Sequence, residues 1–136
     1  MPVSPVRDHV TVLDWHLEIV NRNSVAAMLI HKFSAWHHLK ASEMKPESGE
    51  SQVWKQLLIR RTYDDIRKSL IFIASITTIR KAIALLVDLD IVSVHKRPKE
   101  WKEFRFDRAN YYLFNPDRVL ELYNELSIAN RDNYEN

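Results

Sequence analysis

The sequence of 136 residues contains no cysteine and a single glycine, Gly49. Without cysteine the chain can form no disulfide, no thiolate zinc site and no iron–sulfur cluster, and it has no thiol nucleophile. With one glycine it can form neither the G-x-G-x-x-G turn nor the G-x-x-x-x-G-K-[ST] loop, because both need glycines where the backbone approaches phosphate. These absences exclude dinucleotide binding, P-loop nucleotide hydrolysis and thiol chemistry.

Long apolar segments are also missing. No apolar run approaches the roughly 18 residues of a membrane span. The first residues lack the apolar core of a signal peptide. We therefore expect a cytoplasmic protein with no membrane partner.

The length and the 46% of hydrophobic residues indicate one folded domain. A chain of this size buries roughly 65 to 70% of the surface that its unfolded form exposes. We expect a flexible N-terminus over 1–9, a single domain over 10–127 and a flexible tail over 128–136.

The net charge of +2 is unevenly distributed. Residues 1–53 carry five basic and six acidic side chains, residues 54–108 carry thirteen and seven, and residues 109–136 carry two and five. The net charges of the three segments are thus −1, +6 and −3. A basic segment between neutral and acidic ends is typical of a surface that meets a polyanion, although a solvated basic face gives the same count.

Capping residues and apolar spacing predict three helices in the first two thirds of the chain. Residues 10–20 fit a strand or a short helix, and Asn23 or Ser24 caps a helix over 24–40. A loop over 41–52 and a short strand or extended segment over 54–61 follow. Thr62 and Asp65 match the [ST]-x-x-[DE] capping box of a helix over 63–70. After a turn at 71–74, Ser75 caps a helix over 75–89.

The remaining third predicts a hairpin and a last helix. Residues 91–95 and 109–114 are β-type runs separated by a basic loop. Asn115 and Pro116 suit the cap and first position of a helix over 116–127. The predicted fold is therefore mainly α with a small β-hairpin (α+β): a winged helix-turn-helix with extra N- and C-terminal helices.

Helix 75–89 and the basic loop are the predicted DNA-binding site. The apolar residues of this helix share one face, which leaves small, hydrogen-bonding and cationic side chains on the other. The predicted recognition residues are Ser75, Thr77, Thr78, Arg80, Lys81 and Ala84. A wing would add salt-dependent contacts to the DNA backbone. The predicted wing residues are Lys96, Arg97, Lys99, Trp101, Lys102 and Arg105.

Several segments together resemble the N-terminal winged-helix domain of phage and plasmid replication initiators and replisome organisers, a group related to the DnaD-like replication proteins. The resemblance covers about residues 10–126 and is carried by 24–36, Trp54, 62–66, 75–83, Leu86, 89–92 and 107–112. It implies binding of duplex or origin DNA, frequently as a dimer, and assembly with replication proteins. Asp90 stands where this family usually has glycine, at a position that favours the left-handed conformation.

Two other functions fit the same pattern, namely a winged-helix transcriptional regulator and a protein-interaction module without DNA binding. We expect no enzymatic activity, since Asp64 and Asp65 have no accompanying nucleophile and Asp65 is explained by capping. We expect no cofactor and no metal, because no carboxylate lies at ligand spacing from the histidines of helix 24–40. The aromatic and leucine content of 24–40 and 116–127 fits either a homodimer interface or a larger monomeric core.

Overall fold

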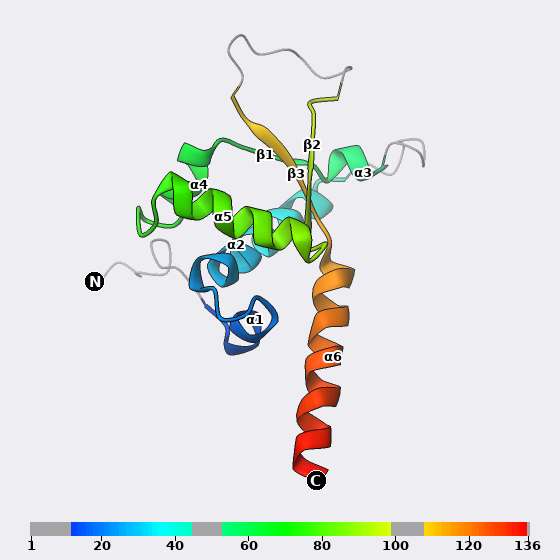
Figure 1. Ribbon diagram of the computed structural model, residues 1–136. Coiled ribbons are helices and arrows are strands. Elements are labelled where there is room, and N and C mark those ends of the chain that lie inside the picture. Colours follow the sequence, from blue (N-terminus) through cyan, green and yellow to red (C-terminus); the bar gives the residue numbers. More distant parts are fainter. Residues whose placement is uncertain (1–11, 45–52, 99–107, 136) are drawn as a thin grey trace, which may run out of the picture.

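The protein is mainly helical, with a small three-stranded antiparallel sheet (Figure 1). The computed structural model describes residues 12–44, 53–98 and 108–135, and of these the side chains of 53 and 130–135 are not described. The helices are α1 (Asp14–Ile19), α2 (Ser24–Ser42), α3 (Val53–Gln56), α4 (Tyr63–Ser69), α5 (Ile76–Asp88) and α6 (Pro116–Glu135). The strands are β1 (Ile59–Arg61), β2 (Val92–His95) and β3 (Asn110–Phe114). The predicted α+β class is confirmed.

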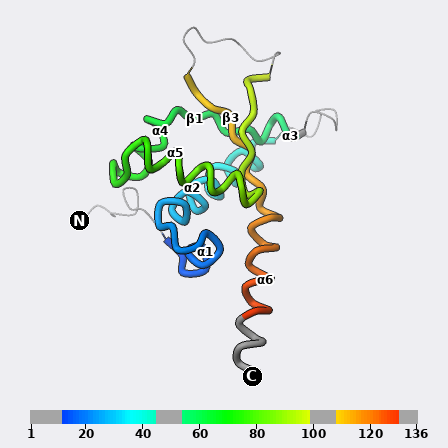
Figure 2. The backbone as a smooth tube through the Cα atoms, viewed as in Figure 1, coloured from blue at the N-terminus to red at the C-terminus, as the bar shows by residue number. Residues whose placement is uncertain are grey.

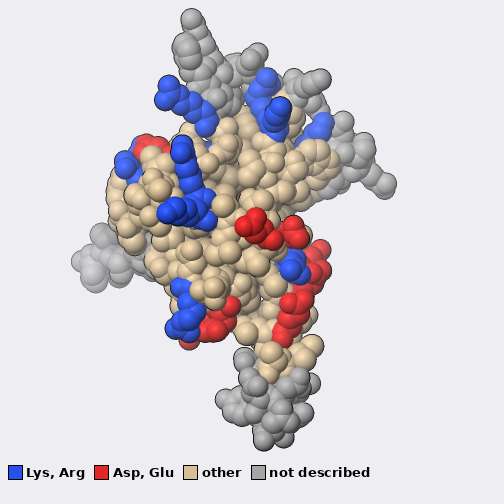
Figure 3. Space-filling model, in the orientation of Figure 1, with Lys and Arg blue, Asp and Glu red and all other residues tan. Residues whose placement is uncertain are grey.

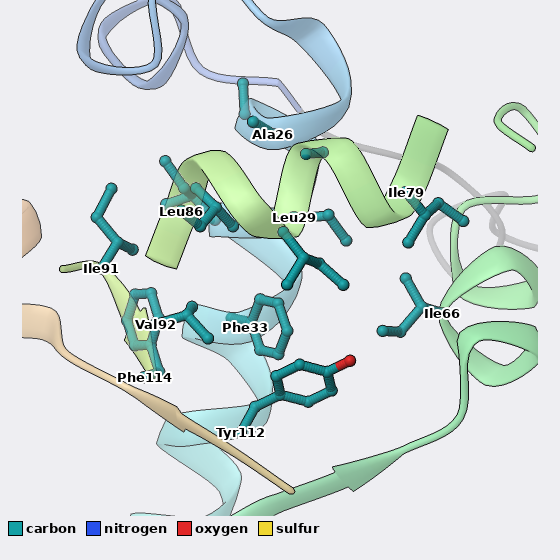
Figure 4. Packing of buried hydrophobic residues seen from close by; sticks show 14 of the residues in the cluster. Ala26, Leu29, Phe33, Ile66, Ile79, Leu86, Ile91, Val92, Tyr112 and Phe114 are labelled. Atoms are coloured by element: carbon teal, nitrogen blue, oxygen red, sulfur yellow. The ribbon is translucent and has the colours of Figure 1, made fainter. Parts of the chain in front are cut away.

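Helix α2 forms the centre of the core. Of the two caps that the sequence left open, Asn23 is the one used, since its side chain accepts a hydrogen bond from the Ala26 amide at 3.0 Å. Ala26 and Ala27 are fully buried, and their small side chains let α5 pack closely. Figure 4 shows Phe33 of α2 beside Tyr112 of the sheet, and their ring centroids lie 5.2 Å apart. The core thus joins α2, α4, α5 and one face of the sheet.

The sheet has the order β1-β3-β2, and both pairings are antiparallel. Tyr112 of β3 pairs with Ile59 on one side and with Val94 on the other. The predicted hairpin of β2 and β3 is confirmed. Of the strand or extended segment expected over 54–61, only Ile59–Arg61 is a strand; Trp54 instead lies in the helical turn α3. There the Leu57 amide bonds to the Trp54 carbonyl at 3.1 Å, since Lys55 and Gln56 are good helix formers.

The ends of the chain differ from the expectation in two places. Residues 14–19, for which strand and helix were both open, form helix α1. The helix expected over 116–127 runs to Glu135 and includes most of the segment 128–136 that we expected to be a flexible tail. Residues 128–135 are polar, but they include no proline or glycine that would end a helix. The flexible N-terminus expected over 1–9 lies outside the described residues.

Three helices end in the same hydrogen-bonded turn without glycine. After α5, Asp90 has φ 61°, the Asp90 amide bonds to the Val87 carbonyl, and the Ile91 amide bonds to the Leu86 carbonyl. This pair of bonds is the Schellman motif, which normally places glycine at the left-handed position. Asp90 is therefore left-handed, as expected. Asn21 after α1 and Ile71 after α4 occupy the equivalent position, with φ of 54° in both cases.

One junction ties α5, the sheet and α6 together. Only Asn115 separates β3 from α6, and Figure 2 shows the chain passing directly from strand to helix. The Asn115 amide bonds to the Ile91 carbonyl at 2.8 Å, and the Arg118 guanidinium donates to the Leu89 carbonyl at 2.9 Å. The Asn115 side chain caps α6 through the Arg118 amide at 3.3 Å, as predicted. The root of α6 is therefore fixed to the C-terminal end of α5.

Candidate nucleic-acid interface

The N-terminus of α5 is built by Ser75. Its hydroxyl accepts a hydrogen bond from the Thr78 amide at 3.2 Å and lies 3.0 Å from the Thr78 hydroxyl. Both side chains are exposed, and this arrangement satisfies one of the amides that every helix start leaves unpaired. The predicted cap is confirmed, so that the first turn of α5 faces solvent in a fixed orientation.

The predicted recognition residues gather on one exposed face of α5. Ile79, Ala82, Ile83 and Leu86 are buried on the opposite face. The exposed residues Thr77, Thr78, Arg80, Lys81 and Ala84 are called the α5 face below. This face combines two cations, two hydroxyls and a methyl group within two turns of helix. Such side chains can donate to base edges and phosphates and can contact a thymine methyl.

Arg80 is held by an aromatic ring that the sequence did not reveal. Its guanidinium carbon lies 4.9 Å from the centroid of the Tyr63 ring, which is a cation–π contact. Tyr63 is the first residue of α4 and lies inside the capping box, directly after Thr62. In that box Asp65 donates its amide to the Thr62 hydroxyl at 3.0 Å and accepts the Thr62 amide at 2.9 Å. The cap of α4 thus fixes the position of the ring on which Arg80 rests.

The same capping box changes the acidity of Asp65. The hydrogen bond from the Thr62 backbone amide lowers the pKa of the Asp65 carboxyl below its ordinary value, with smaller contributions from the Thr62 hydroxyl and from Arg61 and Lys68. The carboxylate therefore stays ionised in its capping role at all physiological pH values.

The hairpin contributes basic residues at the ends of its strands. Lys96 follows β2 and is exposed, whereas Arg97 is half-buried and donates to the Pro98 carbonyl at 3.3 Å. Arg108 is exposed just before β3. The other predicted wing residues, Lys99, Trp101, Lys102 and Arg105, lie outside the described residues. The structure thus describes two of the six predicted wing residues.

On the face that Figure 3 shows, basic and acidic side chains gather mostly over different elements. In Figure 3, Lys and Arg lie mostly over the half that carries the hairpin and α4, and Asp and Glu lie mostly along α6. Asp64 forms ion pairs of 3.4 Å with Arg67 and with Lys68 on α4, which neutralise part of that surface. Lys81 and Lys96 have no acidic partner among the residues that the structure describes. The α5 face and the hairpin thus each carry a lysine whose charge is not neutralised by a neighbouring carboxylate of the described segments.

The histidines of α1 and α2 lie outside the α5 face and the hairpin. His16 packs against Trp15 at 4.0 Å between ring centroids, and burial lowers its pKa to about 4, with a smaller contribution from His31. Burial and the neighbouring His38 also lower the pKa of His37. Within 12–44, 53–98 and 108–135, no three His, Asp or Glu side chains converge on a point that could hold a metal ion.

Two further observations concern the helices and the relatives of the chain. Among the described helices none is both long enough and apolar enough to cross a membrane. Comparison of the chain with protein-family models, with curated proteins and with solved structures gave no match.

Proposed function

We propose that this protein is a winged-helix protein that binds duplex DNA through the α5 face and the β2–β3 hairpin. The order α2, β1, α4, α5, β2, β3 and the sheet order β1-β3-β2 support this proposal, because a winged helix-turn-helix has the same order and pairing. In this fold the second helix of the helix-turn-helix enters the major groove. Here that helix is α5.

The observation that carries the proposal is the chemistry of the α5 face beside a capped and exposed N-terminus. Recognition helices contact base edges mainly through their N-terminal half. Arg80 and Lys81 would donate to guanine, and Thr77 and Ala84 would meet a phosphate or a thymine methyl. The amides near Ser75 would take a backbone phosphate.

The hairpin supplies the second contact of the proposed complex. Lys96 and Arg108 are exposed at the two ends of the loop between β2 and β3. Cations at these places would bind phosphates next to the groove that α5 occupies, and such contacts add affinity without sequence preference.

We further propose that the DNA is a replication origin of a phage, plasmid or other mobile element. This part of the proposal rests on the resemblance of residues 24–36, 62–66, 75–83 and 107–112 to replication initiators. A map of bound sites tests it. Sites at an origin support replication, and sites over promoters would make the protein a transcriptional regulator.

The DNA-binding proposal is tested by titrating the protein into fluorescent duplex DNA at rising salt. We expect affinity to fall steeply with salt, since each neutralised phosphate releases a counterion. Arg80→Ala and Lys81→Ala should each weaken binding to a selected site by about 1 to 3 kcal/mol per lost base contact.

The matched control is Arg22→Ala. Arg22 is exposed between α1 and α2 and pairs with Glu18 at 2.7 Å, so its loss changes the net charge equally but outside the proposed surface. If Arg22→Ala and Arg80→Ala lowered the affinity for DNA equally, binding would depend only on the net charge of the protein. Absence of binding at low salt would overturn the proposal and leave a protein-interaction module.

A further inference from the structure

The turn between α4 and α5 exposes three consecutive large apolar side chains. Ile71, Phe72 and Ile73 are 47%, 59% and 58% exposed, and they are called the apolar turn below. Among the described residues, every other exposed large apolar side chain stands alone in the sequence. Single exposed apolar residues are ordinary on a protein surface, whereas a contiguous group marks a surface that makes contact with something else.

The apolar turn is both strained and rigid. Ile71 and Phe72 have φ of 54° and 58°, a left-handed conformation that is costly for any residue with a side chain and most costly for a β-branched one. The three amides of the turn all bond to carbonyls of α4 and its C-cap, at 3.0 to 3.1 Å. Strain that the surroundings hold in place is common at binding sites. Backbone geometry and exposure both disfavour apolar residues here, which indicates that their side chains make a contact in a complex.

The Phe72 ring rests against a cation of α4. The Arg67 guanidinium carbon lies 5.1 Å from the centroid of the ring. Asp64 forms an ion pair of 3.4 Å with the same guanidinium. The ring therefore has a preferred position, although more than half of the Phe72 surface stays open to solvent.

The apolar turn is continuous with the α5 face. Tyr63 and Arg67 are four residues apart on α4, so they lie on the same side of that helix. Tyr63 contacts Arg80 of the α5 face at 4.9 Å, and Arg67 contacts Phe72. Two cation–π pairs thus form a strip that leads from the α5 face to the apolar turn. Figure 1 shows that this turn passes directly into the N-terminus of α5.

We propose that Phe72 stacks on an unstacked nucleobase of the DNA that is bound at the α5 face. This inference rests on the proposed function. Proteins hold unpaired bases with exposed aromatic rings among cations, because every base has a face that can stack on a ring. Ile71 and Ile73 flank the ring and would contact the edges of the base. The base comes either from a single strand next to the duplex or from a kinked step within it.

Other occupants fit the apolar turn less well. A stable protein interface takes about 20 to 30 residues from each side, whereas the turn supplies three, and the exposed residues Asp64, Lys68, Thr77 and Thr78 on the neighbouring helices are polar or charged. A paired base within a straight duplex is covered on both faces by its neighbours. An unstacked base is therefore the group in DNA that matches an exposed aromatic ring beside arginines.

The experiment compares three fluorescent DNAs by anisotropy. All contain the same selected duplex site: the first has blunt ends, the second continues into a single strand of thymidines, and in the third this strand is abasic. The abasic strand keeps the phosphates and removes the base faces. We expect Phe72→Ala to weaken binding by about fivefold or more, the contribution of one stacked base. A loss confined to the thymidine strand places the base in single-stranded DNA, and an equal loss with all three DNAs places it in a kinked duplex step.

Variants of Phe72 separate stacking from a contact that is only apolar. Phe72→Tyr keeps the ring and should retain affinity. Phe72→Leu keeps an apolar side chain without an aromatic face and should lose about as much affinity as Phe72→Ala. Leu39→Ala is the matched control, because Leu39 is a large apolar residue of α2 that is 57% exposed, and this variant should bind like the unchanged protein. Circular dichroism and thermal unfolding establish that each variant is folded.

Three results would overturn this inference alone. One is full affinity of Phe72→Ala for all three DNAs while Arg80→Ala binds weakly, and another is full affinity of Phe72→Leu. The third is binding to phosphatidylcholine–phosphatidylserine vesicles that is lost in Phe72→Ala, which would assign the apolar turn to a membrane surface. Absence of binding to all three DNAs at low salt would instead overturn the proposed function together with this inference.

Discussion

The contact between Tyr63 and Arg80 shows how single residues prepare the α5 face. A free arginine side chain samples many rotamers, and part of its entropy is lost when it binds. The Tyr63 ring restricts the Arg80 guanidinium before any ligand arrives, at a distance of 4.9 Å. The pairing of Thr62 and Asp65 in turn fixes Tyr63 at the start of α4. Three residues at the start of α4 therefore restrict the position of the Arg80 side chain on α5.

Replacement of Tyr63 tests this control. Tyr63→Ala should weaken binding to a selected duplex by about two- to fivefold, which corresponds to the 0.5 to 1 kcal/mol typical of an exposed cation–π contact. Tyr63→Phe keeps the ring and should retain affinity. Fluorescence anisotropy measures both. A loss for Tyr63→Ala that persists in the Arg80→Ala background would show that Tyr63 acts independently of Arg80.

For single residues, the sequence predicted the contacts between residues that lie close together in the chain. The caps at Asn23, Thr62, Ser75 and Asn115 join residues three apart, so their geometry follows from local spacing. The contact of Tyr63 with Arg80 joins two helices. It depends on how α4 packs against α5, which no local pattern encodes.

At the scale of elements, three helices of this chain end in a left-handed residue that is not glycine. Asn21, Ile71 and Asp90 each take a left-handed conformation that costs an ordinary residue roughly 1 to 2 kcal/mol. Ile71 is the least suited of the three, since it is β-branched. The fold accepts this cost because the Schellman bonds satisfy carbonyls that would otherwise lack partners.

Asp90→Gly should therefore stabilise the protein. Glycine removes the steric cost at φ 61°, and the gain outweighs its greater flexibility in the unfolded chain by about 0.5 kcal/mol. Thermal unfolding should show a rise in Tm of about 2 °C. Asp88→Gly changes the same residue type inside the helix and should lower Tm, because glycine is a poor helix former. A lower Tm for Asp90→Gly would contradict this account.

Boundaries of elements were predicted where a capping residue marks them and missed where none does. The starts of α4 and α5 follow Thr62 and Ser75 as expected. The sequence predicts too early an end for α6, because its polarity changes near 128, whereas polar residues extend a helix that has already formed. The sequence predicts a strand or extended segment where the turn α3 lies, because four residues are too few to show a helical period.

For the molecule as a whole, the buried side chain of His16 should make the stability of the fold depend on pH in the mildly acidic range. His16 is only 4% exposed, and its pKa is about 4 in the folded protein against an ordinary value of 6.5. The unfolded chain therefore binds a proton more readily than the folded one between these values. The neutral, buried imidazole of His16 therefore contributes fully to the stability of the folded protein above about pH 6.5. This contribution is lost as the pH falls toward 4.

Urea unfolding at several pH values checks this. The free energy of unfolding should decrease from about pH 7 to about pH 5, and His16→Phe should flatten most of that decrease. A smaller slope should remain in the variant, since the pKa of His37 is lowered as well. Asp65 does not interfere, because its pKa is lowered and it stays ionised in this range. Constant stability of the unchanged protein over this range would refute the prediction.

Charge and fold class could be predicted for the whole molecule, but the shape of its C-terminal end could not. The basic segment 54–108 contains both α5 and the hairpin, so its net charge of +6 already located the proposed surface. The sequence left open whether the apolar residues of α6 are exposed or belong to the core, and in the structure Leu120 and Tyr123 are exposed. Leu122 and Leu126 look alike in sequence to Leu120, and only the packing of α1 decides which of them is covered.

The junction at Asn115 joins the hairpin to the last helix without a linker. Strand β3 passes into α6 through this one residue, and Arg118 holds the end of α5 through the Leu89 carbonyl. We therefore expect a change in the tilt of the hairpin to move α6 with it, because a single residue leaves little room for a hinge.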